Sequence, residues 1–202
     1  MEKMDKIKCF EKEVSYIEDS LLKEDAKYLI ENLPDYFFEV DASSTGKYHP
    51  KYAAGIGGLM RHVKSAVKMA VELLSNPIIG KPYSARDRDL IIIALLIHDG
   101  LKYGKVKTDK YTKFDHPLLI SEYVKENRAN LKMTDDDMEK ICAMVESHMG
   151  PWNVSNYSSV VLNVPKAPME KFVHMCDYLA SRRFINLEFD DNNNVIDESK
   201  DS

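Results

Sequence analysis

Apolar residues recur at spacings of three and four along most of the chain, and this helical period constrains the fold more than any other feature. The segment 59–74 shows the period most clearly, because one helical face would collect its apolar residues together with a histidine. That face consists of Leu59, His62, Val63, Ala66, Val67, Ala70 and Leu74. Alternation with period two is convincing nowhere in the chain. We therefore predict an all-α fold, a single helical bundle.

The segment 90–97 is apolar at each of its eight positions and is compatible with two interpretations. Its length and its isoleucines suit a buried strand. A capping-box pattern, Ser84 followed by Asp87, precedes it, and no helix breaker occurs between residues 84 and 99. These two features favour a buried helix.

Further boundary signals divide the chain into helices and loops. Residues 3–32 predict one or two helices that end before Pro34, since proline restricts the residue before it. Thr134 and Asp137 form a second capping box, which predicts a helix containing His148 at its end. The stretch 151–167 is irregular, and a last helix is expected from about Pro168.

Charge and composition predict one domain with a short tail. We expect a helical segment, 1–33, packed on a domain that spans 34–187, followed by a disordered acidic tail, 188–202. The tail carries six acidic residues and one lysine, which accounts for the whole net charge of −5. The neutral remainder lacks the basic footprint of a duplex-DNA-binding protein, but it is compatible with a nucleotide or a short single-stranded oligonucleotide.

The sequence also predicts a cytoplasmic protein without a membrane span. The longest apolar run, 90–97, is far too short to cross a bilayer, and the first residues do not resemble a signal peptide. The three cysteines are an odd number without a CxxC pair, which argues against a disulfide framework.

Several ionisable residues fall on apolar helical faces, where they need a partner. His62 lies on the apolar face of 59–74, and Asp177 lies on that of the last helix. A buried imidazole or carboxylate must be paired or bound to metal, because burying it bare costs several kcal/mol. His98 and Asp99 directly follow the apolar run 90–97. Imidazole and carboxylate together suit Mn, Fe, Co, Ni or Zn ions better than calcium.

The order of these residues resembles a known signature. His62, His98-Asp99 and Asp177 are similar to the H…HD…D pattern of the HD superfamily of metal-dependent phosphohydrolases. The flanking segments 57–61, 94–97 and 174–180 resemble that superfamily too, and Lys102 stands where some members carry a lysine. Segments 48–74 and 146–152 look most similar to the HD domains of bacterial 3′→5′ exoribonucleases. Those enzymes normally carry an OB-fold domain ahead of the HD domain, whereas residues 3–32 here predict charged helices and no β-rich segment, which argues against processive RNA degradation.

The resemblance implies a site with one or two divalent transition-metal ions. Asp99 would bridge two ions, with His62, His98 and Asp177 on one and His116 and His148 on the other. His116 and His148 lie between the HD pair and the last aspartate, where two-metal members place histidines. In the alternative, one ion is bound, and His116 and His148 hold the substrate phosphate.

Other residues are candidates for substrate contacts. Asp99 and Lys102 are the catalytic candidates, with Lys102 also binding phosphate, although a solvated helix-end lysine is the alternative. Arg61 is a further candidate for phosphate binding or for a surface ion pair. His49 either lines the pocket or orders its loop, and His174 is expected to have a supporting role.

The function expected from this set is hydrolysis of a phosphoester of a nucleotide or short oligonucleotide by a metal-activated water. Tyr111, Trp152 and Tyr157 are candidates for stacking on a base, or they simply pack their loops. Two alternatives remain open: a di-iron oxygenase built on the same scaffold, and a non-catalytic nucleotide-sensing module.

Overall fold

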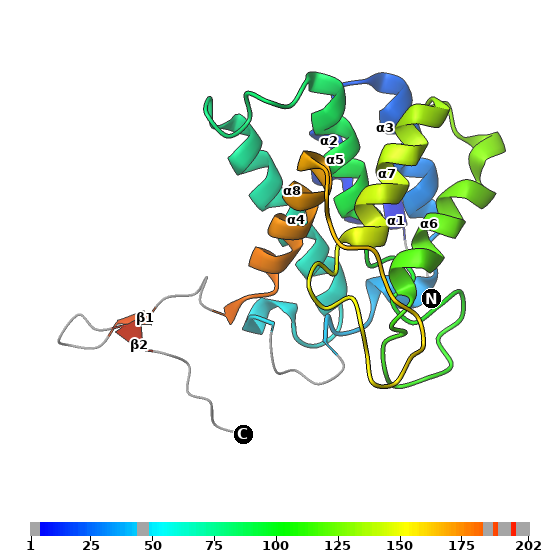
Figure 1. The fold of residues 1–202 in the computed structure, drawn as a ribbon, viewed down its shortest axis with the longest axis vertical. Coiled ribbons are helices and arrows are strands. Elements are labelled where there is room, and N and C mark those ends of the chain that lie inside the picture. The colour runs from blue at the N-terminus through cyan, green and yellow to red at the C-terminus, as the bar shows by residue number, and fades with distance from the viewer. Residues whose placement is uncertain (1–4, 44–48, 184–187, 190–194, 197–202) are drawn as a thin grey trace.

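The structure, a computed structural model, describes residues 5–43, 49–183, 188–189 and 195–196. Within these residues the chain is a bundle of α-helices, so the prediction of an all-α fold is confirmed (Figure 1). The helices are α1 Lys6–Cys9, α2 Glu11–Ser15, α3 Ser20–Glu31, α4 Gly58–Ser75, α5 Ala85–Ile97, α6 His116–Glu126, α7 Asp135–Ser147 and α8 Pro168–Ala180. Short 3-10 helices occupy Asp35–Phe38, Lys51–Ala53 and Arg128–Asn130.

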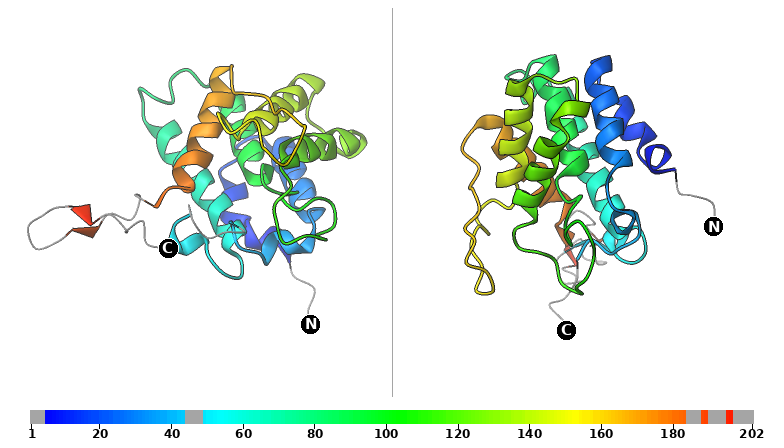
Figure 2. Two further views of the ribbon diagram at one scale, coloured as in Figure 1. Left: turned by 60° about the horizontal axis from the view of Figure 1, so that its bottom comes forward. Right: turned by 90° about the vertical axis from the view of Figure 1, so that its right-hand side faces the viewer.

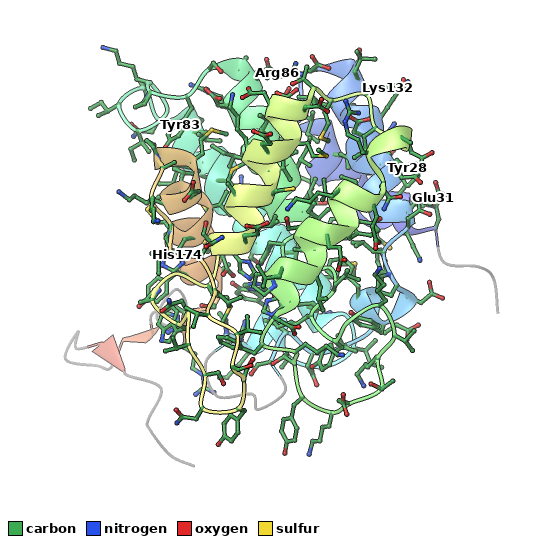
Figure 3. The ribbon with its side chains drawn as sticks, turned by 45° about the vertical axis from the view of Figure 1, so that its right-hand side comes forward. Tyr28, Glu31, Tyr83, Arg86, Lys132 and His174 are labelled. Atoms are coloured by element: carbon green, nitrogen blue, oxygen red, sulfur yellow. The ribbon has the colours of Figure 1, made fainter. Side chains whose placement is uncertain are left out.

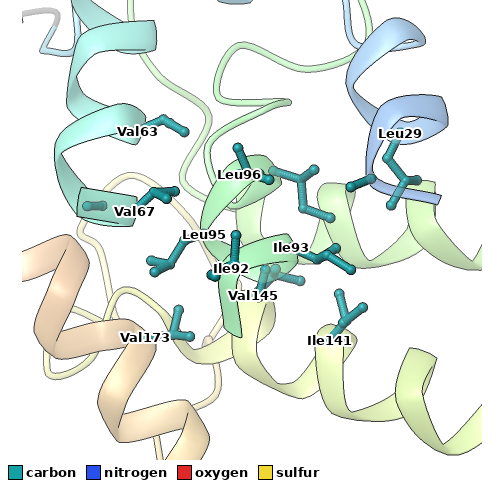
Figure 4. Packing of buried hydrophobic residues seen from close by; sticks show 14 of the residues in the cluster. Leu29, Val63, Val67, Ile92, Ile93, Leu95, Leu96, Ile141, Val145 and Val173 are labelled. Atoms are coloured by element: carbon teal, nitrogen blue, oxygen red, sulfur yellow. The ribbon is translucent and has the colours of Figure 1, made fainter. Parts of the chain in front are cut away.

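Helix α5 lies at the centre of the bundle. It is apolar on every face between Leu90 and Ile97, and such a helix is stable only when other elements surround it. Helices α3, α4, α7 and α8 all pack against it, and Figure 4 shows their side chains around Ile92, Ile93 and Leu95. The capping box between Ser84 and Asp87 is present. The apolar run is therefore a helix, and the strand interpretation is wrong.

The helices around α5 bury the faces that the sequence pattern indicated. Every member of the predicted face of α4, from Leu59 to Leu74, is buried, including His62. Helix α7 begins with the expected capping box between Thr134 and Asp137. Asp137 also receives a two-pronged hydrogen bond from Arg86 near the start of α5, and this ion pair ties the two helices together at one end.

The structure has three helices, α1 to α3, in the segment 3–32, where the sequence pattern predicted one or two. The break between α2 and α3 has a long-range cause: the buried carboxylate of Asp89 on α5 accepts the backbone N–H groups of Glu18 (2.8 Å) and Asp19 (2.9 Å). The side chain of Asp19 then caps α3 by accepting from Leu21 and Leu22. Neither α1 nor α2 alone is long enough to be stable, so packing holds them.

A second buried carboxylate holds α3 against the other side of the bundle. Asp25 accepts the backbone N–H groups of Lys132 (2.8 Å) and Met133 (2.7 Å) in the loop before α7. Apolar residues of the same segment, such as Phe10 and Leu29, are fully buried in the common core. The described part of 1–33 therefore packs on the rest of the chain.

Little of the predicted acidic tail lies within the described residues. Strand β1 (Glu188–Phe189) pairs antiparallel with strand β2 (Val195–Ile196), and Glu188 lies opposite Ile196. The predicted disorder of the rest of 188–202 falls outside the described residues. Within the described residues, no helix combines the length and the apolar character that a bilayer crossing requires.

Five helix ends meet at one end of the bundle and make it a possible site. Helices α5, α7 and α8 end there, while α4 and α6 begin there (Figures 1 and 2). The long loops 101–115 and 151–167 extend from the same end (Figure 2). Side chains near five helix ends can therefore converge there.

We predict that Asp25→Ala lowers the free energy of unfolding by about 2 kcal/mol, because the backbone N–H groups of Lys132 and the buried Met133 lose their acceptor. Urea denaturation followed by circular dichroism measures this change. Glu72→Ala is the matched control: Glu72 forms only an exposed ion pair with Lys68 and should cost less than about 0.5 kcal/mol. Equal costs for the two variants would contradict the role given to Asp25.

Candidate metal centre

The six predicted metal ligands meet at the shared end of the bundle. Each sits near a helix end there: His62 near the start of α4, His98 and Asp99 directly after α5, His116 at the start of α6, His148 directly after α7, and Asp177 in the last turn of α8. Three helix C-termini and two helix N-termini meet there, so their partial charges largely offset one another and the side chains decide which ion the site attracts.

Three of the histidines are oriented in the same way. Each has its Nδ1 at 2.7 Å from the backbone carbonyl three residues earlier, so that Nδ1–H donates and Nε2 faces the site. The pairs are His98 with Leu95, His116 with Lys113 and His148 with Val145. This orientation makes Nε2 of each ring the atom that could bind a metal ion.

The two carboxylate oxygens of Asp99 face different histidines. Oδ2 lies 3.7 Å from Nε2 of His62 and 3.8 Å from Nε2 of His98. Oδ1 lies 3.1 Å from Nε2 of His116 and 3.8 Å from Nε2 of His148. Two groups of three potential ligands result, both buried, and Asp99 belongs to both. Such an arrangement can hold two ions with Asp99 between them.

Asp177 joins the group of His62 and His98. Its Oδ1 lies 2.9 Å from Nε2 of His62 and 3.4 Å from Nε2 of His98. The first group thus contains two imidazoles and two carboxylates, whereas His116 and His148 share only Asp99. Their Nε2 atoms are 3.2 Å apart.

An unpaired buried atom tests whether these residues fit a metal ion. Nε2 of His98 is buried and has no hydrogen-bond partner among the described residues. Buried polar atoms are nearly always satisfied, and an exception needs an explanation such as an ion. A mixed nitrogen and oxygen ligand set suits divalent transition metals. The residues therefore fit a metal ion.

The electrostatics keep both carboxylates ionised. Burial raises the pKa of Asp99, but Lys102 and His98 outweigh burial and hold it well below its ordinary value. Burial likewise raises the pKa of Asp177, but the adjacent imidazoles of His62 and His98 outweigh burial and hold that pKa well below its ordinary value. Two negative charges are thus available at neutral pH to attract cations.

The histidines respond to the same surroundings in opposite directions. Burial, helped by His98 and His116, lowers the pKa of His148 to about 3, so its ring is neutral at neutral pH. Burial also lowers the pKa of His98, but Asp99 and Asp177 outweigh it and the net shift is upward. A metal ion must displace that proton, so acid weakens metal binding.

The site opens into a cavity of about 500 Å³, a volume in the range of small-molecule sites. Lys102 and His49 line it, as the sequence analysis expected. The ammonium of Lys102 lies 2.5 Å from Oδ2 of Asp99, and the ring of His49 packs edge-on against His62 with centroids 5.0 Å apart. Burial lowers the pKa of His49 to about 3.

Arg61, a candidate for phosphate binding, does not line the cavity, and neither does the fully buried His98. Its guanidinium donates to the backbone carbonyls of Tyr52, Ala54 and Ile56. These bonds order the segment before α4, so Arg61 supports the loop that carries His49 and does not line the cavity itself.

His174 supports the site through the backbone. Its Nδ1 lies 2.7 Å from the carbonyl of His148 (Figure 3). Gly150 adopts φ +62°, and a Cβ at that position would overlap the imidazole of His174. The turn after His148 is thus held tightly against α8.

Sequence reasoning missed several residues of the cavity wall. Tyr178 directly follows Asp177, and Ser181 and Arg182 lie one helical turn further on. This closeness to a predicted metal ligand could have indicated that they line the cavity. Thr112 comes from the long loop after Asp99, and no sequence pattern pointed to it. All four line the cavity.

No protein-family model matches the chain, and neither a curated protein nor a solved structure matches it.

We predict that acid destabilises the chelator-treated protein below pH 6.5. The unfolded chain takes up protons on His49 and His148 near pH 6.5, whereas the folded chain resists until about pH 3. Because both folded-state pKa values lie below the unfolded ones, stability falls as the pH falls, by up to about 1.4 kcal/mol per pH unit for each histidine.

Urea denaturation between pH 6.5 and about pH 4 measures how steeply the free energy of unfolding falls with pH. His148→Gln should reduce this slope by up to about 1.4 kcal/mol per pH unit, the contribution of one histidine. An unchanged slope in that variant would show that His148 is not held neutral by burial.

Proposed function

We propose that the protein is a metal-dependent phosphohydrolase that acts on nucleotides or short single-stranded oligonucleotides. The observation that carries this proposal is the buried carboxylate of Asp99, shared between two groups of histidines at the floor of a cavity. The resemblance of the same residues to the HD superfamily supports it.

The ligand residues fit one or two divalent ions. His62, His98, Asp99 and Asp177 would hold the first, and Asp99, His116 and His148 the second. When bound, such ions lower the pKa of water and offset the charge of a phosphoryl group. The protein contributes the buried carboxylates that would hold the ions in place, and the imidazoles that hydrogen bonds to the helix ends orient.

Lys102 is the residue of this chain best placed to hold the substrate phosphate. Its side chain is 13% exposed, lines the cavity and ends 2.5 Å from Asp99. A lysine ammonium is a mobile point charge with three donors, so it can exchange its contact with Asp99 for a phosphate oxygen. In that position it stabilises negative charge that develops on the phosphoryl oxygens.

We predict that the protein hydrolyses bis(p-nitrophenyl) phosphate when Mn²⁺ is supplied, and that Asp99→Asn lowers kcat/KM at least about 100-fold, because the shared ligand is lost. Absorbance of released p-nitrophenolate measures the rate. Asp109→Asn is the matched control, since it makes the same change on the exposed part of the loop after the site and should keep full activity.

Oxygen uptake by the iron-loaded protein is measured alongside. Hydrolysis that depends on Asp99, without oxygen uptake, supports the proposal. Metal-dependent oxygen consumption with no hydrolysis would contradict it and favour oxygenase chemistry. Equal activity of Asp99→Asn and Asp109→Asn would place the reaction elsewhere.

A further inference from the structure

One wall of the cavity differs chemically from the metal-binding floor. Aromatic and cationic side chains form it, and none of them is a potential metal ligand: Trp152, Tyr178 and Arg182. Trp152 comes from the loop 151–167, whereas Tyr178 lies on α8 and Arg182 just after it. The other two aromatic candidates, Tyr111 and Tyr157, are exposed and do not line the cavity.

These three side chains form a compact cluster of planar groups. The rings of Trp152 and Tyr178 are nearly parallel, with an angle of 13° and centroids 5.6 Å apart. The guanidinium of Arg182 lies 4.6 Å from the centre of the Tyr178 ring and 5.9 Å from that of Trp152. Trp152 nevertheless remains 48% exposed, so much of its indole is available to a ligand.

The same contacts that hold the metal ligands also fix this wall. Tyr178 is adjacent to Asp177, and Trp152 follows His148 by four residues. His174 donates to the carbonyl of His148 and also packs against both aromatic rings, with centroids 6.2 Å from Trp152 and 6.1 Å from Tyr178. The wall is therefore held in place before a ligand arrives, which reduces the ordering cost of binding.

We propose that Trp152, Tyr178 and Arg182 form a subsite for a planar aromatic ring, and that this subsite gives the cavity a preference for phosphoesters that carry such a ring. The inference rests on the proposed function for the placement of the phosphate, which faces Lys102 and the metal ligands. The ring stacks on the exposed indole, and the guanidinium adds a cation beside the stack.

The alternative is that Trp152 only packs the loop 151–167 against α8. In that case a ligand's ring would add nothing to its affinity, because the wall would serve the fold alone. Comparing two phosphoesters that differ only by the ring separates the two roles.

Trp152 is the only tryptophan of the chain, so its fluorescence reports directly on this wall. We expect adenosine 5′-monophosphate to quench the fluorescence and to bind at least about tenfold more tightly than ribose 5-phosphate, which has the same phosphate and sugar but no base. Equal affinities, no quenching, or no binding of either compound would overturn the proposal.

Calorimetric titration of variants gives a second readout. Trp152→Leu should weaken adenosine 5′-monophosphate about tenfold and leave ribose 5-phosphate unchanged, whereas Trp152→Phe should retain most of the affinity. Tyr157→Leu is the matched control, because Tyr157 is an exposed aromatic residue of the same loop. Equal losses for both ligands in Trp152→Leu would indicate a structural role and contradict the subsite.

Phosphate release, measured in the same samples, keeps the two proposals separate. Base-dependent binding with no phosphate release from either compound and no hydrolysis of bis(p-nitrophenyl) phosphate would contradict the hydrolase and leave the subsite standing. Phosphate release with no dependence on the base would contradict the subsite and leave the hydrolase standing.

Discussion

Asp99 carries a negative charge at the end of an apolar helix, inside the bundle, and the surrounding site compensates for it. An ionised carboxylate in such a place is expensive unless cations and hydrogen-bond donors surround it. Lys102 supplies one positive charge, and imidazoles face both oxygens of the carboxylate. A second carboxylate, Asp177, faces His62 and His98 at the same place. A divalent cation would replace the proton that the two carboxylates stabilise on His98, so the charges of the site are compatible with a bound metal ion.

Most helix boundaries could be predicted from the sequence, because interactions between neighbouring residues determine where these helices begin and end. The capping boxes at Ser84 and Thr134 located the starts of α5 and α7, and proline marked the start of α8. The break before α3 could not be predicted in this way. It depends on Asp89, some seventy residues along the chain, whose carboxylate accepts backbone donors at the break.

The candidate site shows the same division between local and long-range effects. His62 and Asp177 could be chosen because each interrupts an apolar helical face, and burial of an ionisable group requires a partner. The stacking of Trp152 on Tyr178 could not be predicted, because the two residues are distant in sequence and only the packing of the loop on α8 brings their rings together. Arg61, beside His62, was a candidate for phosphate binding or for a surface ion pair, yet its hydrogen bonds are made with local backbone carbonyls.

The most direct test of a two-metal centre is the metal content of the protein purified without chelators, measured by elemental analysis. The account predicts about two equivalents of Mn, Fe, Co, Ni or Zn per chain. It also predicts about one equivalent when His116 and His148 are both replaced by alanine, because the group of His62, His98 and Asp177 remains. One equivalent in the unaltered protein would contradict the second metal and leave His116 and His148 as substrate-binding groups. No bound metal, even after reconstitution with Mn²⁺, would contradict the centre as a whole.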